Sequence, residues 1–219
     1  MKKYLFKTLF CLALLMSSKT VIIAQSVDNQ PIKSEFNDLN EALKNPDKVY
    51  RLNLSGQHFK EFPKGLSQFK NLEYLSLRND HLTTLSPEIG TLSKLKVLDL
   101  GENDFKLLPK NFTNLKNLEE LFLDNDKNLD VGQDLEILSK LPKLRILHLD
   151  NDGIKTLPQS IRKLAHLDSL YLSKNLFRVV PPEVKNLKNL KFLDLNHNHL
   201  PTNLHLNQPH VASGLRIKF

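Results

Sequence analysis

Three residues with aromatic or imidazole rings recur at nearly the same interval in the second half of the chain. Phe122, His148 and Tyr171 are separated by 26 and 23 residues. Ile146 and Phe192 lie close to them in the same pattern. Rings and aliphatic side chains that gather on an exposed surface form a patch where another molecule binds non-covalently. Packing between neighbouring strands is the alternative interpretation, because aromatic residues favour sheets with or without a ligand.

Acidic residues recur beside this candidate patch at the same kind of interval. They are Asp99, Asp124 and Asp150, with Glu102 and Glu120 close by. Like charges on neighbouring strands repel one another, so a basic ligand or a cation would stabilise such a row. If the row binds a partner, we therefore expect a basic one. A solvated charged face without a ligand is the alternative interpretation.

The spacing of these residues follows a repeated leucine-rich segment. Six copies of the pattern L-x-x-L-x-L-x-x-(N/D) begin at Leu72, Leu95, Leu118, Leu144, Leu167 and Leu190. The steps between them are 23, 23, 26, 23 and 23 residues, and a seventh copy starts at Val49. A period in the twenties with this signature is typical of a leucine-rich repeat solenoid.

Each repeat combines a strand with an irregular return segment. In the copy that starts at Leu95, Leu98 and Leu100 alternate with other residues, as in a strand with one buried face. Asn103 follows at the turn, and Pro109 suits a tight 3-10 or irregular path better than a long helix. Stacked copies bury leucines that a single copy cannot bury. We therefore predict an α/β leucine-rich repeat solenoid. It is a curved horseshoe of about seven repeats with terminal caps, a parallel sheet on its concave face, and 3-10, irregular and short helical segments on its convex side.

The candidate site residues divide among three outward positions of the repeat. Positions 3, 5 and 7 face the solvent on the concave side, whereas the leucines at positions 1, 4 and 6 form the core. The assignments are Ile146 and Phe192 at position 3, Asp99, Phe122, His148, Tyr171 and Asp194 at position 5, and Asp124 and Asp150 at position 7.

Position 9, where the strand turns away from the sheet, departs from the usual asparagine in several copies. Asp80, Asp126 and Asp152 stand there instead. A carboxylate accepts hydrogen bonds but cannot donate them. We therefore expect the ladder of turn contacts to persist with fewer links, at a local cost in stability and with no chemistry. The asparagine that precedes each of these residues is an alternative donor.

The first residues of the chain have the features of a secretory signal peptide. Lysines at positions 2, 3 and 7 precede an apolar stretch from Leu9 to Met16, which is too short to span a bilayer. Ala24 offers a small residue for cleavage. We expect the protein to be secreted, or held in a periplasm or cell envelope, with no membrane span.

Both ends of a solenoid need polar caps over their exposed cores. Ser34 is placed to cap a helix from Glu35 to Leu43, and Leu215 to Phe219 alternates like a last strand. In the longer fourth repeat, Gln133 to Lys140 is expected to form a helical turn on the convex side. The predicted domains are a signal peptide at 1–24, a polar lead and N-terminal capping helix at 25–48, the repeat domain at 49–200, and a C-terminal cap at 201–219.

The charge balance and the single cysteine argue against several classes of function. Cleavage after residue 24 removes four lysines and no acids, which leaves 31 − 4 = 27 basic and 24 acidic residues, a net charge of +3. This balance gives no support to nucleic-acid binding. The one cysteine, Cys11, lies in the predicted signal peptide. No nucleophile–base pair, phosphate loop or metal cluster is recognisable, so we expect no enzyme activity, no metal and no cofactor.

The repeats resemble those of a known group. They read L-x-x-L-x-L-x-x-N/D-x-L, with L-P-x-x-I/F/V in most return segments, and residues 144–164 (LRILHLDNDGIKTLPQSIRKL) show the pattern well. The resemblance extends from about Val49 to Leu200. The group comprises secreted bacterial leucine-rich repeat proteins with 23-residue repeats of the plant disease-resistance and Ras-scaffold type. It implies protein recognition through the concave surface, and it has no common catalytic residue.

These observations lead to the hypothesis of a non-enzymatic secreted module that binds a protein or peptide. Glycan or cell-wall binding is an alternative, because Phe122, Tyr171 and Phe192 can stack on sugar rings. Asp194 and Asn196 would then bind the sugar hydroxyls. A structural role in the cell envelope is a third possibility, and self-association would favour it.

Overall fold

The computed structural model describes residues 34–59, 61–201 and 214–219. All of these residues belong to one compact unit, Ser34–Phe219. The predicted signal peptide, its cleavage point at Ala24 and most of the polar lead therefore lie outside the described residues.

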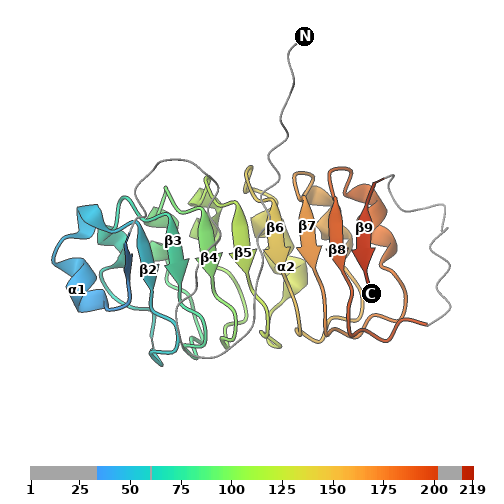
Figure 1. The fold of residues 1–219 in the computed structure, drawn as a ribbon, viewed down its shortest axis with the longest axis horizontal. Coiled ribbons are helices and arrows are strands. Elements are labelled where there is room, and N and C mark those ends of the chain that lie inside the picture. Colours follow the sequence, from blue (N-terminus) through green and yellow to red (C-terminus); the bar gives the residue numbers. More distant parts are fainter. Residues whose placement is uncertain (1–33, 60, 202–213) are drawn as a thin grey trace, which may run out of the picture. The chain divides into compact units, whose positions relative to one another are not determined.

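The described residues contain nine short strands, which form one parallel sheet whose spatial order follows the chain (Figure 1). The strands are β1 (Glu35–Phe36), β2 (Arg51–Asn53), β3 (Tyr74–Ser76), β4 (Val97–Asp99), β5 (Glu120–Phe122), β6 (Ile146–His148), β7 (Ser169–Tyr171), β8 (Phe192–Asp194) and β9 (Arg216–Lys218). Equivalent residues of successive repeats are paired, so Leu98 lies opposite Leu121, which lies opposite Leu147. The parallel sheet predicted from the repeat period is confirmed.

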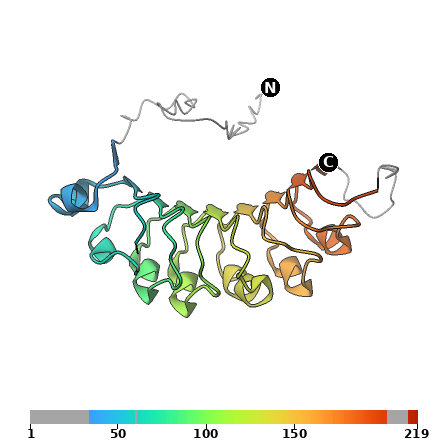
Figure 2. The ribbon, with the colours of Figure 1, turned by 90° about the horizontal axis from the view of Figure 1, so that it is seen from below.

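The return segments are short helices on the convex side, while the strands line the concave side (Figure 2). The 3-10 helices are η1 (Pro46–Lys48), η2 (Leu66–Gln68), η3 (Pro87–Thr91), η4 (Lys110–Asn114), η5 (Gln159–Lys163) and η6 (Pro182–Asn186). Pro109 immediately precedes η4 and Pro158 precedes η5, in extended conformations that lead into the helix. The predicted 3-10 return path is thus confirmed.

The leucines of the strands point away from the concave face and form a continuous core. The central residue of every strand from β2 to β8 is a leucine that is fully buried. Phe105 and Phe112 fill the space on the convex side and are also fully buried. Burial of each such side chain contributes about 1.5–3 kcal/mol. Because the core side chains of one repeat are shielded from water by the adjacent repeats, the stability of each repeat depends on its neighbours.

The N-terminal edge differs from the sequence prediction. A helix that starts at Glu35 with Ser34 as its cap is wrong, because residues 35 and 36 form β1 and pair with β2. The helix α1 (Leu39–Leu43) begins later, and the carboxylate of Asp38 accepts a backbone N–H from its first turn at 2.8 Å. A strand here pairs the first edge of the repeat sheet, which a helix starting at Glu35 would have left open.

The C-terminal edge follows the prediction. The alternation from Leu215 to Phe219 predicted a last strand, and β9 pairs with β8 so that Ile217 lies opposite Leu193. The central part of the predicted C-terminal cap, 202–213, lies outside the described residues.

The fourth repeat contains a true α-helix. The helical turn predicted at Gln133 to Lys140 is confirmed as α2 (Val131–Leu138), which starts two residues earlier. Asp130 caps it by accepting a backbone N–H at 3.1 Å, and Leu135 and Leu138 are buried against the core. None of the helices in the described part of the chain is long and apolar enough to cross a membrane.

Candidate functional site

The strand register brings the predicted ring residues side by side on the concave face. Phe122 ends β5, His148 ends β6 and Tyr171 ends β7, and the three are paired neighbours across the sheet. Side chains alternate along a strand, so the leucine before each of them points into the core. Three consecutive repeats therefore present one ring each to the same row.

The rings of Phe122, His148 and Tyr171 stack in a row, and the ring of Phe192 is tilted against Tyr171. We call these four residues the aromatic ladder. The ring centroids of Phe122 and His148 are 3.9 Å apart and those of His148 and Tyr171 are 4.2 Å apart, with an interplanar angle of 12° in both pairs. Phe192 lies 5.3 Å from Tyr171 at 57°. The guanidinium of Arg216 lies 4.9 Å from the Phe192 ring centroid. All four ladder residues are half-buried, so the rings pack across strands and still leave part of their surface exposed.

The central ring of the ladder also contacts two acidic side chains. Nε2 of His148 lies 3.0 Å from Oε1 of Glu120, and Nδ1 lies 3.9 Å from Oδ2 of Asp150. The side chains of His148 and Glu120 are each 14% exposed. A protonated imidazole here would carry its charge between two carboxylates and two rings. Ile146 is half-buried on the same strand, two residues before His148.

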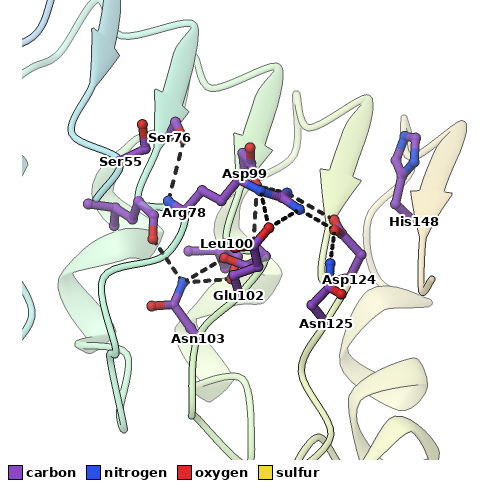
Figure 3. Close-up of polar contacts among 12 residues, drawn as sticks. Ser55, Ser76, Arg78, Asp99, Leu100, Glu102, Asn103, Asp124, Asn125 and His148 are labelled. Carbon is purple, nitrogen blue, oxygen red and sulfur yellow. Dashed lines mark hydrogen bonds and ion pairs between the residues drawn. The ribbon is translucent and has the colours of Figure 1, made fainter. Parts of the chain in front are cut away.

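Arg78 binds the acidic residues at the other end of the candidate site, a role that sequence reasoning missed. Its guanidinium contacts three carboxylates, with Asp99 at 3.1 Å, Glu102 at 3.0 Å, and Asp124 through both carboxylate oxygens (Figure 3). Burial raises the pKa of Asp99, and the positive charge of Arg78 opposes that rise. The row of like charges expected from the sequence is therefore partly neutralised within the protein.

Gly101 explains how Arg78 reaches a carboxylate two repeats away. A Cβ atom at position 101 would lie 2.5 Å from Nη1 of Arg78 and 2.8 Å from Oδ1 of Asp124. Any larger residue would therefore obstruct the path of the arginine. The sequence does carry a signal for this contact, because position 7 reads Arg78, Gly101 and Asp124 in three consecutive repeats.

Replacing Arg78 with glutamine is expected to lower the free energy of unfolding by about 1–3 kcal/mol, because the largely buried carboxylates of Asp99 and Asp124 lose their cation. Urea denaturation at neutral pH measures the loss. Arg145→Gln is the matched control, since Arg145 is 49% exposed and lies 3.7 Å from Asp168. The control is expected to change stability by no more than about 0.5 kcal/mol. Equal losses in the two variants would contradict a stabilising role for Arg78.

The two remaining predicted acids are held by local contacts. Asp150 accepts the backbone N–H of Ser173 at 2.7 Å, and burial raises its pKa while hydrogen bonds from Ser173 oppose the rise. Asp194 accepts the backbone N–H of Asn196 at 2.9 Å, and its Oδ2 lies 3.3 Å from Nζ of Lys218. Both side chains thus have partners inside the fold.

The centre of the concave face keeps a surplus of negative charge. Five carboxylates contact Arg78 or His148, namely Asp99, Glu102, Glu120, Asp124 and Asp150. With His148 neutral, the surplus in this set is 5 − 1 = 4 negative charges. Such a field attracts cationic groups and repels anionic ones. Over the described residues, no group of three or more His, Cys, Asp or Glu side chains is arranged to hold a metal ion.

A parallel sheet with one short helical return per strand, and a concave face of outward side chains, defines the leucine-rich repeat class of solenoids. The chain belongs to the leucine rich repeat family, whose model matches residues 70–127 and 142–200. No curated protein matches the chain.

Several solved structures are similar to the chain. A leucine-rich repeat protein of Leptospira interrogans is 31% identical with a TM-score of 0.51, over 77% of this chain and 54% of that one. A chain of the TLR13–ssRNA13 complex is 28% identical with a TM-score of 0.64, over 83% and 25%. A chain of the Drosophila Toll–Spatzle complex is 22% identical with a TM-score of 0.63, over 84% and 25%, and this likeness shows the fold alone. The chain thus spans about half the length of the Leptospira protein and a quarter of the other two.

Proposed function

We propose that this chain is a non-enzymatic binding module that recognises a protein or peptide through the concave face of β4–β8. The observation that carries the proposal is the aromatic ladder, in which three half-buried rings stack across β5, β6 and β7 and the half-buried Phe192 of β8 is tilted against the last of them. Rings that remain partly exposed at the centre of a concave surface are the kind of residue that dominates binding energy in protein interfaces.

The chemistry of the face favours a protein ligand with apolar and basic side chains. Apolar side chains fit against the exposed parts of the ladder, and basic ones lie favourably beside the five carboxylates. TLR13 was solved with a single-stranded RNA. A nucleic-acid backbone would be repelled by the surplus negative charge on this face, so the proposal is for a protein partner.

Selection from a random linear-peptide phage library tests the proposal directly, because the library samples many candidate ligands at once. Selected peptides are expected to contain basic and apolar residues. Tyr171→Ala is expected to weaken their binding at least tenfold, a loss of about 1.4 kcal/mol. Val179→Ala is the matched control, because Val179 is 62% exposed and lies in the return segment between β7 and η6. Isothermal titration calorimetry measures both affinities.

Two outcomes of this selection would overturn the proposal. The first is that peptides bind the wild type and Tyr171→Ala with equal affinity, which would move the site away from the ladder. The second is that no peptide is selected while the protein self-associates in analytical ultracentrifugation. That result would favour a structural role in a cell envelope.

The stacking geometry makes the glycan alternative less suitable. Sugar rings bind aromatic side chains face to face, but His148 covers one face of Phe122 and one face of Tyr171. Phe192 has a guanidinium over its ring. A glycan array run beside the peptide selection discriminates between the two ligand classes.

The proposal includes export from a bacterial cell, with cleavage near Ala24. The basic start and the apolar stretch of residues 9–16 support this location. Expression of the full chain in a bacterial host, followed by mass spectrometry of the exported protein, gives the new N-terminus. A full-length chain that stays in the cytoplasm would contradict export.

A further inference from the structure

The side chains at position 9 of successive repeats form a buried column at the start of the return segments. The column consists of the buried Asp80, Asn103, Asp126, Asp152 and Asn175 and the half-buried Asn198. One oxygen of each side chain accepts a backbone N–H from the preceding turn. For example, the N–H of Asn103 donates to Oδ1 of Asp126 at 2.8 Å, and the N–H of Asp126 donates to Oδ1 of Asp152 at 2.8 Å. The ladder predicted from the sequence therefore persists on this side.

The amide nitrogen Nδ2 of Asn103 and Asn175 donates hydrogen bonds, whereas their Oδ1 accepts them. Nδ2 of Asn103 donates to the carbonyl oxygens of Leu77 at 2.8 Å and Leu100 at 2.7 Å. Nδ2 of Asn175 makes the equivalent pair of bonds at 2.7 and 3.1 Å. In these two repeats, two backbone carbonyl oxygens thus face the atom that stands where the asparagine has Nδ2.

The three aspartates of the column have no partner at the equivalent atom. Oδ2 of Asp80, Asp126 and Asp152 is buried without a hydrogen bond. Because Asn103 and Asn175 direct Nδ2 at two leucine carbonyls, the repeat symmetry leads us to expect Oδ2 of Asp126 to face the equivalent carbonyls of Leu100 and Leu123. Two carbonyl oxygens beside an ionised carboxylate would repel it, and burial of an unpaired charge is costly. At Asp126 and Asp152 the preceding asparagine does not supply the missing donor, because the side-chain amides of Asn125 and Asn151 donate to Asp124 and Asn125 respectively.

The surroundings of Asp126 and Asp152 favour the neutral form. The charged groups that face Asp126 are Asp104, Asp124 and Asp152, and all are acidic. Asp124 and Asp150 face Asp152 in the same way. Burial, with smaller contributions from these carboxyls, raises the pKa of Asp126 to about 9 and that of Asp152 to about 8. Asp80 differs, because His58 and His81 lie near it and oppose the rise that burial produces.

We propose that Asp126 and Asp152 are held as protonated carboxylic acids whose Oδ2–H supplies one of the two hydrogen bonds that an asparagine amide donates, and that ionisation removes this bond. The protonated acid donates one hydrogen bond where the ionised form donates none. The two protonated aspartates lie in the turns that follow β5 and β6. It is independent of any ligand, so its test does not bear on the proposed binding function.

The sign of the pH dependence follows from the proton balance. The pKa of each aspartate is higher in the folded chain than in the unfolded chain. At a pH between its unfolded-state pKa and its folded-state pKa, the aspartate is therefore protonated in the folded chain and ionised in the unfolded chain. Stability therefore falls as the pH rises from about 4 to about 8 or 9. Each group lowers the folding equilibrium constant by up to tenfold for each pH unit in this window.

The test uses the full chain and the double variant Asp126→Asn/Asp152→Asn. The wild type is expected to lose at least tenfold in its folding equilibrium constant for each unit between about pH 5 and pH 7. The double variant is expected to lose most of this slope, with a remainder below about pH 6 from Asp134, whose pKa burial raises to about 6. It is also expected to be at least tenfold more stable than the wild type at about pH 7. Asp47→Asn is the matched control, because Asp47 is exposed, and it should keep the wild-type slope.

A second measurement decides the question even if the double variant fails to fold. Carbon-13 NMR of the aspartate carboxyls in the wild type should show two signals that remain protonated at neutral pH. Titration of all aspartates in the ordinary range near pH 4 would overturn the proposal. So would a double variant that keeps the full pH slope of the wild type.

Discussion

Replacement of Asn103 by alanine is expected to destabilise the protein by about 3–5 kcal/mol. Asn103 is 4% exposed, and its Nδ2 donates to the carbonyls of Leu77 and Leu100. Its Oδ1 accepts the backbone N–H of Leu82 at 3.0 Å. Alanine would leave these backbone groups buried without partners, at about 1–3 kcal/mol for each. Because several backbone groups lose their partner at once, Asn103→Ala is one of the two substitutions with the largest expected effects.

Chemical denaturation of the Asn103→Ala variant measures this loss. Asn114→Ala is the matched control, because Asn114 is exposed in η4 of the same repeat. The control is expected to change stability by no more than about 0.5 kcal/mol. A loss below about 1 kcal/mol for Asn103→Ala would show that the column contributes little to the fold.

Truncation of Phe112 to alanine is expected to cost about 3–5 kcal/mol, because a large side chain is removed from a packed core. Phe112 lies in η4 and is fully buried. Repeats of a solenoid contact only their neighbours, so the effect should spread to η3 and α2 and fade beyond them. Hydrogen exchange measures this spread, and denaturation measures the total loss.

Leu107→Ala provides the comparison for Phe112→Ala within one repeat. Leu107 is 41% exposed, and its truncation is expected to change stability by no more than about 0.5 kcal/mol. Uniform loss of exchange protection from β2 to β9 in the Phe112→Ala variant would mean that the chain unfolds as a single unit. That result would contradict the local coupling described above.

The repeat period made the sheet predictable in detail. Because the leucine pattern fixes both the strand and its register, it also placed Phe122, His148 and Tyr171 in one row of the concave face. The stacking of His58 and His81, with ring centroids 5.4 Å apart, follows from the same repeated position. Residues at equivalent positions in adjacent repeats become neighbours in space, so the sequence alone shows which side chains meet.

Features that cross or interrupt the period were harder to predict. Arg78 spans two repeats to reach Asp124, and this contact depends on the missing side chain of Gly101. The spacing of the apolar residues near the N-terminus fits one helix, but the chain divides there into β1 and α1. The protonation of Asp126 and Asp152 depends on burial and on unpartnered atoms, which a residue pattern does not contain.

The aromatic ladder combines two roles that need not exclude each other. Its rings pack across β5–β8, and this packing holds them in fixed positions. Rigid rings lose little conformational freedom when a ligand binds, so a preformed row favours recognition. A variant that removes one ring should therefore weaken binding more than it weakens the fold.

The most direct test of the proposed function is an NMR titration of the side chains of Phe122, His148 and Tyr171 with a library-selected peptide. We expect the ring signals of all three residues to shift with saturation, at the affinity that calorimetry gives for the same peptide. Signals from η3 and η4 on the convex side should stay unchanged. Saturable shifts confined to the convex helices, with the ladder rings unaffected, would contradict recognition through the concave face.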